Sequence, residues 1–298
     1  MFTKKTNFKP MKADAVVSAY KRNVLILWVL HALTVVAFFV VAAFLVMQKI
    51  TLFNAFLSVM FLCVLNYLFY TGRRIQLHLL NNILNVNCDP VKFEKVFRKL
   101  SEARVNRGVC QLNIARGQYY AGKFEEALAT LDAMARPKDN SMQIFLYYNV
   151  KAGCCEELGN FDRVVEIREK VKQIMPNLKD GSPALRNGQQ LLTIIDGMLT
   201  FHRGSYMRAY EIYEDLFEMT SYPLSRLTVL IKLAKMDQVT GAIRSAADHC
   251  EYVLDSGGTT FYKKQAEEIL ALCRPRKKAE EPATEQTGED KEDADGAE

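Results

Sequence analysis

The chain has 298 residues, a hydrophobic content of 49% and a net charge of +5. Its mean hydropathy of −0.06 averages an oily N-terminal part with a polar remainder. Its seven cysteines are odd in number and lack C-x-x-C spacing, which argues against a disulfide or metal framework and indicates buried thiols in a reducing compartment.

Two apolar runs near the N-terminus are each long enough to cross a bilayer. The runs Asn23–Met47 and Thr51–Thr71 contain no charged residue. As helices that rise about 1.5 Å per residue, they would span ~37 Å and ~31 Å, against a hydrocarbon core of ~30 Å. Because only residues 48–50 separate them, the sequence predicts a tight hairpin of two transmembrane helices.

The flanking charges predict how this hairpin is oriented. Residues 1–22 hold six basic groups and one acidic group, Arg73 and Arg74 follow the second run, and the turn has Lys49 alone. By the positive-inside rule, the N- and C-termini then both lie in the cytoplasm. The compact build and the lack of sorting motifs favour the plasma membrane of a bacterium.

Two other interpretations of the apolar runs stay open. A secretory signal peptide is one, but the first run exceeds the roughly 7–15 residues of a typical h-region and a second run follows at once. A buried helical hairpin of a soluble protein is the other, although uncharged runs of this length are rare in soluble cores.

From about residue 73 to 273 the apolar pattern is helical, and one set of residues recurs in it four times. Each copy centres on a glycine, with a small residue seven positions before it, an aromatic residue or isoleucine two after it, and a small or aliphatic residue five after it. The glycine can reverse the chain between antiparallel helices, and the small residues let helix axes approach closely. The copies are Ala115, Gly122, Phe124 and Ala127; Ala152, Gly159, Phe161 and Val164; Gly197, Gly204, Tyr206 and Ala209; and Ala234, Gly241, Ile243 and Ala246.

This pattern resembles the tetratricopeptide repeat (TPR) family, whose helix-turn-helix units recur at about 34 residues. The resemblance covers residues 105–258, with segments such as A-R-G-Q-Y-Y-A-G-K-F-E-E-A at 115–127. The chain departs from the family in its longer spacings, in lacking the family's tryptophan, and in having Arg168 in place of a bulky apolar residue. The resemblance implies a solenoid of about four helical hairpins, which stack because none can bury its apolar face alone.

The resemblance also implies a concave groove that binds a partner protein or peptide. The Lys/Asn/Arg set with which some family members clamp a C-terminal carboxylate is not reproduced. The family's groove positions lie on the first helix of each unit, and carrying them over to this sequence gives Asn113, Arg116, Tyr120, Asn149, Glu156, Ile194, Met198, Lys232 and Lys235.

The sequence therefore predicts an all-α chain. Asp89–Pro90 is a helix-start signal, a surface loop is expected from Pro176 to Asn187, and Thr259 or Thr260 starts a last helix that caps the array. The parts are a basic cytoplasmic N-terminus (1–22), the transmembrane hairpin (23–72), connecting helices (73–104), the TPR-like domain with its capping helix (105–273) and an acidic tail too polar to fold (274–298).

No pattern in the chain indicates catalysis. There is no phosphate loop, G-x-S-x-G, H-E-x-x-H or G-x-G-x-x-G, and neither Cys154–Cys155 nor His249–Cys250 has a second pair at ligand spacing. We therefore expect no enzyme, cofactor, metal site or nucleic-acid partner. His31, Asn54 and Asn66 lie within the apolar runs, where such residues hold helices together or, in an oligomer, line an ion path.

Three functions fit these features. The favoured one is a membrane-tethered scaffold or adaptor whose TPR-like groove captures a partner at the cytoplasmic face. The alternatives are a structural subunit of a larger membrane complex and a channel or transport component that uses the intramembrane polar residues. The identity of the partner and the oligomeric state do not follow from the sequence.

Overall fold

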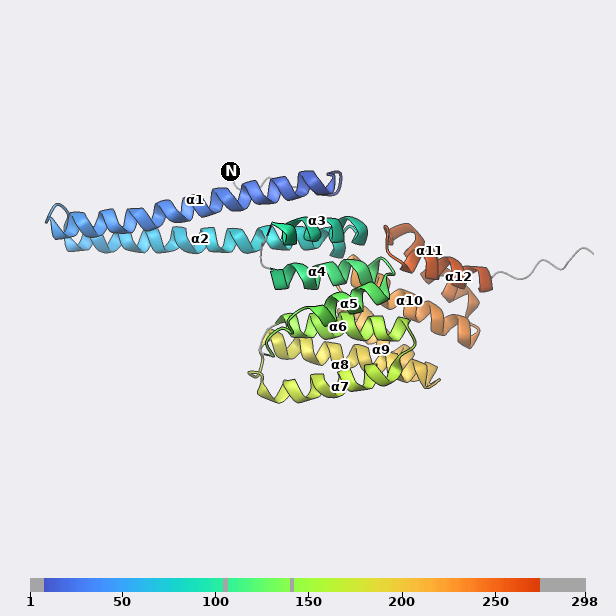
Figure 1. Ribbon diagram of the computed structural model, residues 1–298. Helices are drawn as coiled ribbons and strands as arrows, with labels where there is room; N and C mark the ends of the chain where they lie inside the picture. Colours follow the sequence, from blue (N-terminus) through green and yellow to red (C-terminus); the bar gives the residue numbers. More distant parts are fainter. Residues whose placement is uncertain (1–7, 104–106, 140–141, 274–298) are drawn as a thin grey trace, which may run out of the picture.

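The computed structural model describes residues 8–103, 107–139 and 142–273, and the described part is all-helical (Figure 1). The acidic tail that was predicted to be disordered lies outside the described residues, as do residues 1–7 of the basic N-terminus. The helices are α1 (Ala13–Val46), α2 (Leu52–Asn85), α3 (Pro90–Glu102), α4 (Arg107–Tyr120), α5 (Phe124–Ala133), α6 (Met142–Glu157), α7 (Phe161–Ile174), the short η1 (Met175–Asn177), α8 (Pro183–His202), α9 (Tyr206–Met219), α10 (Pro223–Thr240), α11 (Ile243–Ser256) and α12 (Tyr262–Cys273).

The first two helices form a long antiparallel hairpin that extends beyond the rest of the molecule (Figure 1). Each has 34 residues, and each is long and apolar enough to cross a membrane, a test that a signal sequence near the N-terminus also passes. At the tip, the Thr51 hydroxyl accepts a hydrogen bond from the amide of Asn54 (3.3 Å) and so caps α2. Most exposed large hydrophobic residues of the described chain lie between Leu25 and Ile75, so the apolar surface is concentrated on this hairpin.

The opposite end of the hairpin is packed into the rest of the fold. Val16 of α1 and Leu80 of α2 are buried in the same core cluster as Phe93 of α3. The side-chain amide of Asn23 donates to the side-chain oxygen of Gln76 (3.2 Å). This hydrogen bond between α1 and α2 lies where the buried part of the hairpin ends and its exposed part begins. Residues 13–22 of the predicted basic N-terminus therefore belong to the same helix, α1, as the first apolar run. They do so because their apolar side chains form one face against α3.

The repeats form four helical hairpins: α4–α5, α6–α7, α8–α9 and α10–α11. The turn glycines Gly122, Gly159, Gly204 and Gly241 have φ of +81°, +71°, +78° and +86°, the left-handed region in which a Cβ atom is strained. The small residues before them lie where helices touch: Ala115, Ala152 and Ala234 are fully buried, and a Cβ at Gly197 would lie 3.1 Å from the ring of Tyr213.

Side-chain caps define the starts of α3 and α8, as they do for α2 and α7. The Asp89 carboxylate accepts a hydrogen bond from the amide of Lys92 (3.0 Å), and α3 begins at Pro90 as expected. The loop expected from Pro176 to Asn187 is shorter than predicted. Ser182 accepts a hydrogen bond from the amide of Leu185 (3.2 Å), and α8 already begins at Pro183, whose fixed φ suits a first turn.

The C-terminal helices fold back onto the beginning of the array. The amide of Thr259 donates to the carbonyl of Cys88 (3.0 Å), and the amide of Phe261 donates to the carbonyl of Tyr120 (2.9 Å). α10 also touches α2, and in Figure 1 α11 and α12 lie beside the ends of α3 and α4. The last helix is thus more than a solvent-facing cap: its Tyr262 is fully buried, and the array closes on itself.

We predict that Gly258→Ala lowers the free energy of unfolding by about 3 kcal/mol or more. Gly258 has a φ of +56°, and an added Cβ would overlap the carbonyl oxygen of Cys88 and lie 2.9 Å from its carbonyl carbon. Chemical denaturation of the full chain in detergent measures the loss.

Gly204→Ala is the matched control for this change. Gly204 has a φ of +78° but nothing within 4 Å of an added Cβ, so the substitution costs only the backbone strain of about 1–2 kcal/mol. Equal losses in the two variants would show that the contact with Cys88 contributes nothing.

Candidate functional site

A cavity of about 430 Å³ lies on the side of the array that is formed by the first helices of the units. The family resemblance makes this the concave side, and the cavity is called the concave cavity below. It lies between the C-terminal end of α2, the facing sides of α6 and α8, and the residue that precedes α10. No charged residue lines it. Its lining residues are Asn85, Gln143, Phe145, Leu146, Asn149, Asn187, Gln190, Leu191, Ile194 and Tyr222.

Five primary amides dominate the polar lining of this cavity. Within the described part of the chain, the side chains of Gln143, Asn149, Asn187 and Gln190 have no hydrogen-bond partner. None of the four residues is fully buried, so their donors and acceptors are open to solvent. Each amide offers two N–H donors and one acceptor oxygen, which match the C=O and N–H groups of a peptide main chain. The polar groups of the cavity are therefore suited to hydrogen bonds with the main chain of a bound peptide, and these do not depend on the peptide's side chains.

The fifth amide, that of Asn85, is held in place from behind. Arg116 donates to the Asn85 oxygen (3.0 Å) and to the Asn113 oxygen (2.9 Å), and the Asn113 amide donates to the carbonyl of Val109 (3.0 Å). Arg116 and Asn113 are both buried. The Asn85 oxygen is thus bound by Arg116, whereas the N–H donors of the same side chain have no partner within the described chain.

Of the nine groove residues expected from the family resemblance, two line the concave cavity: Asn149 and Ile194. Arg116 and Asn113 support it from the layer behind. Met198 is buried in the core between the hairpins, and Tyr120 packs edge-on against Tyr262 at 6.1 Å between ring centroids. Whether any of the nine binds a partner stays a prediction.

The remaining three expected groove residues belong to a buried ionic cluster. Lys232 of α10 lies 2.7 Å from a carboxylate oxygen of Glu156 and 3.4 Å from one of Glu157, both at the end of α6. Gln265 of α12 donates to Glu157 (2.8 Å). The side chains of the lysine and both glutamates are less than a tenth exposed, so the helices close over this part of the expected groove.

The cluster shifts the pKa of its members in opposite directions. Burial by itself would lower the pKa of Lys232, but the two carboxylates raise it above its usual value. Burial by itself would raise the pKa of Glu157, but Lys232 and Lys235 lower it. For Lys235 the compensation is incomplete: burial, and then the charge of Lys232, lowers its pKa to about 8, although nearby carboxylates, Glu157 first among them, raise it in part.

Sequence reasoning missed most of the concave cavity. Asn85 lies in α2, outside the repeats, and Asn187 was placed in a loop. Gln143 and Gln190 are on the first helices of their units but were not among the positions carried over from the family. The run N-N-I-L-N at 81–85, amide-rich and next to the array, was the available signal.

The acidic, histidine and cysteine side chains of the described residues are not gathered into a metal-binding group. No cluster of three or more His, Cys, Asp and Glu side chains with metal-binding geometry occurs among them. Burial raises the pKa of the Cys88, Cys110 and Cys250 thiols to about 11, so these thiols stay protonated and unreactive. Burial raises the pKa of Cys154 still further, and its neighbour Cys155 adds to the shift.

Comparison with known proteins identifies the array. The family model described as the SusR N-terminal TPR domain matches residues 99–247, half of the chain. The match confirms a TPR-like array in this region, and repeats of this type bind proteins and are typically non-enzymatic. No curated protein and no solved structure matches the chain.

We predict that Lys232→Met destabilises the fold by about 3–5 kcal/mol, because it leaves two buried carboxylates without their cation. Lys172→Met is the control, since Lys172 pairs with Glu169 at 3.1 Å on the exposed surface and its loss costs less than about 1 kcal/mol. Denaturant unfolding at pH 7 compares the two, and equal losses would contradict a stabilising role for the buried cluster.

We also predict that Lys235→Met stabilises the fold at pH 7, by an amount on the order of 3 kcal/mol. The pKa of Lys235 is about 8 in the folded chain, whereas the ordinary pKa of an exposed lysine is 10.5. Between these values the unfolded state binds more protons, so the contribution of Lys235 to stability rises with pH from about 8 to 10.5. Unfolding free energies measured across this range should lose that rise in Lys235→Met and keep it in Lys264→Met, whose side chain is 82% exposed.

Proposed function

Because the chain belongs to the family of the SusR N-terminal TPR domain, we propose that it is a membrane-tethered scaffold that binds an extended segment of a partner protein in the concave cavity. The observation that carries the proposal is the set of amides without hydrogen-bond partners in the described chain, on the concave side of a protein-binding repeat. Buried amide groups of a ligand need such partners, because an unpaired polar group costs about 1–3 kcal/mol.

The chemistry of the cavity narrows the class of partner segment. The lining combines amides with the apolar side chains of Leu146 and Ile194 and contains no charge. A partner segment fits this lining if its main chain hydrogen-bonds to the amides and one of its apolar side chains packs on Ile194. A strongly charged segment would lose hydration without gaining an opposite charge.

The hairpin supports the membrane tether. Its exposed apolar surface would be unfavourable in water and favourable in lipid. At the base of this surface the guanidinium of Arg73 lies 4.4 Å from the ring centroid of Trp28 and 6.0 Å from that of Tyr70. Aromatic rings with basic groups are typical of the cytoplasmic edge of a membrane span.

Tethering makes modest affinity sufficient. A scaffold and a partner held at the same membrane meet at a high effective concentration, so a cavity of this size can hold a segment that it would bind weakly in solution. We propose the plasma membrane of a bacterium as the location, with both termini in the cytoplasm.

The two alternatives place the function in the hairpin. A complex subunit would use its exposed apolar surface against other membrane helices. A channel component would use His31, Asn54 and Asn66; in the described structure none of these donates or accepts a side-chain hydrogen bond across the hairpin, and the Nδ1 of His31 is buried without a partner.

We expect a photoreactive residue at Asn149 or Asn187 to capture a partner in the native membrane, while the same residue at the exposed Lys264 captures none. In the same experiment Gln190→Leu should lower the yield about fivefold or more, since it removes one amide from the main-chain contacts. Capture only from positions in the hairpin would instead favour a complex subunit, and altered ion flux in His31→Ala a channel.

The proposed tether has its own test. The full chain should remain in the membrane pellet after alkaline carbonate extraction, and its N-terminus should be uncleaved. Charge-reversed Arg73→Glu/Arg74→Glu should reduce correct insertion by weakening the cytoplasmic charge bias. A mature chain that begins after the first apolar run would show that this run is a signal sequence.

A further inference from the structure

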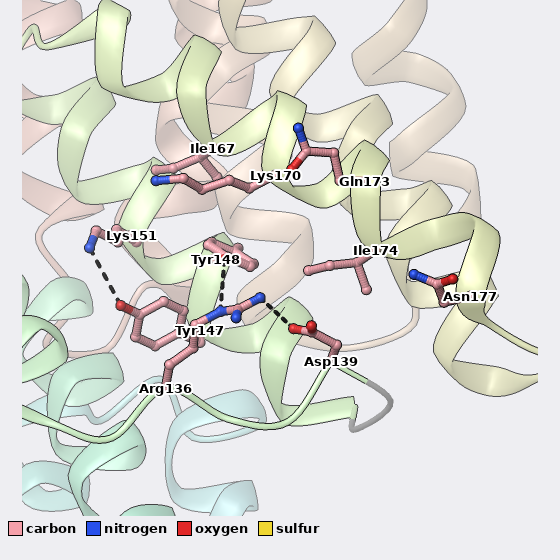
Figure 2. Close-up of a pocket in the computed structure, with 10 residues that line it drawn as sticks. All are labelled: Arg136, Asp139, Tyr147, Tyr148, Lys151, Ile167, Lys170, Gln173, Ile174 and Asn177. Carbon is pink, nitrogen blue, oxygen red and sulfur yellow. Dashed lines mark hydrogen bonds and ion pairs between the residues drawn. The ribbon is translucent and has the colours of Figure 1, made fainter.

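A second cavity of about 490 Å³ opens beside α6 and α7 and is called the tyrosine cavity below (Figure 2). Two tyrosines and two isoleucines form its apolar floor, and basic and amide side chains surround it. Its lining residues are Arg136, Asp139, Tyr147, Tyr148, Lys151, Ile167, Lys170, Gln173, Ile174 and Asn177. Its volume suits a small phosphorylated group with part of its headgroup.

The tyrosine hydroxyls are arranged as donors toward the cavity. Arg136 donates to the Tyr148 hydroxyl (3.1 Å), and Lys151 donates to the Tyr147 hydroxyl (3.4 Å), as the dashed lines in Figure 2 show. Both rings are buried, at 4% and 7% exposure. Since each hydroxyl oxygen already accepts a hydrogen bond, each O–H proton is available to a ligand acceptor.

The charges around the cavity favour an anion. Three cations and one carboxylate line it, and the carboxylate, Asp139, is already paired with Arg136. Lys151 is 2.5 Å from Asp132; burial by itself would lower its pKa, but this carboxylate raises it, so Lys151 stays charged. Lys170 has no ion-pair partner within the described chain. Within the described chain, one cation, Lys170, and the O–H donors of the two tyrosines are therefore left for a ligand.

The cavity lies at one end of the array. Arg136 and Asp139 belong to the α5–α6 connection, and Asn177 ends η1 just before the α7–α8 connection. Figure 1 shows these two connections at the end of the array that is nearer the exposed part of the α1–α2 hairpin. If the hairpin crosses a membrane, this end of the array is the one that faces the membrane surface.

We propose that the tyrosine cavity binds the phosphate group of an anionic phospholipid headgroup. The choice of a lipid as the source of the phosphate rests on the proposed membrane tether; the anion site itself does not. Lys170 pairs with the phosphate oxygens, Arg136 and Lys151 share their N–H donors between the phosphate and their own carboxylates, Asp139 and Asp132, and the two tyrosine hydroxyls donate to the remaining acceptors. Each basic residue near an anionic membrane surface adds to the attraction, and the site would fix the orientation of the array relative to the bilayer.

The test uses the full chain in a neutral detergent, with isothermal titration calorimetry. Three probes are compared: glycerol phosphate, a soluble short-chain phosphatidylglycerol, and the matching phosphatidylcholine, whose choline cancels the charge. We expect the first two to bind and phosphatidylcholine to bind at least about tenfold more weakly. Arg136→Gln/Lys170→Gln should weaken binding of phosphatidylglycerol by about tenfold or more, and Tyr148→Phe by a smaller factor.

Lys172→Gln is the matched control, because Lys172 lies on the same helix, α7, and carries the same charge but does not line the cavity. Its binding should stay within about twofold of the unchanged chain. No binding of either phosphate probe, or an equal loss in Lys172→Gln, would overturn the anion site. Binding of glycerol phosphate without phosphatidylglycerol would overturn the lipid as its source and leave a soluble phosphate ester.

Carbonate extraction of the same variants separates this proposal from the tether. A chain that is extracted from the membrane but still binds glycerol phosphate through Arg136 and Lys170 would refute the tether alone. A chain that stays in the membrane and binds neither phosphate probe would refute the anion site alone.

Discussion

The shape of this protein depends on a backbone contact between its two ends. The amides of Thr259 and Phe261 donate to carbonyls of the α2–α3 turn and of α4, and Gly258 makes room for the approach because it has no side chain. In an open solenoid each unit touches only its neighbours, so the terminal units are free. Here α12 is held against the start of the array, and α10 also reaches α2. The closure determines which part of the concave side remains accessible.

Closure divides the concave side into two regions with different electrostatics. Where α6, α10 and α12 meet, the Lys232 ammonium is enclosed with Glu156 and Glu157, and such a cluster serves folding because its charges are paired and away from water. Farther along, between α2, α6 and α8, the surface stays open and carries amides instead of charges. Unpaired charges at that point would attract ligands of the opposite charge, whereas amides select ligands whose donors and acceptors match their hydrogen-bond geometry. The open region is therefore the part of the groove that we associate with a partner segment.

We propose a separate role for each of three surfaces of the molecule. The apolar hairpin holds the chain in the membrane, the concave cavity takes a partner segment, and the tyrosine cavity takes a phosphate at the end of the array nearer the hairpin. The base of the hairpin is itself part of the folded core, since Val16 and Leu80 pack with α3. The hairpin also packs directly against α3, and α2 contacts α10. In the proposed arrangement, the position of the hairpin in the bilayer would therefore also set the height and orientation of both cavities.

The sequence by itself determined the local features of this protein. Charge-free runs identify the exposed, apolar part of the hairpin helices. A glycine with flanking small residues recurs because each turn needs a left-handed residue and each helix pair needs a close approach. These are constraints within about forty residues of chain, so a single sequence displays them. The tertiary structure alone decided which residues of the expected groove are buried and which line an open cavity. Thr259 and Asp89 are 170 residues apart yet lie within hydrogen-bonding distance, and no local pattern records such a pairing. That long-range closure buries Lys232, which the family resemblance had placed on an open surface, and leaves Asn85, a residue outside the repeats, to line the concave cavity.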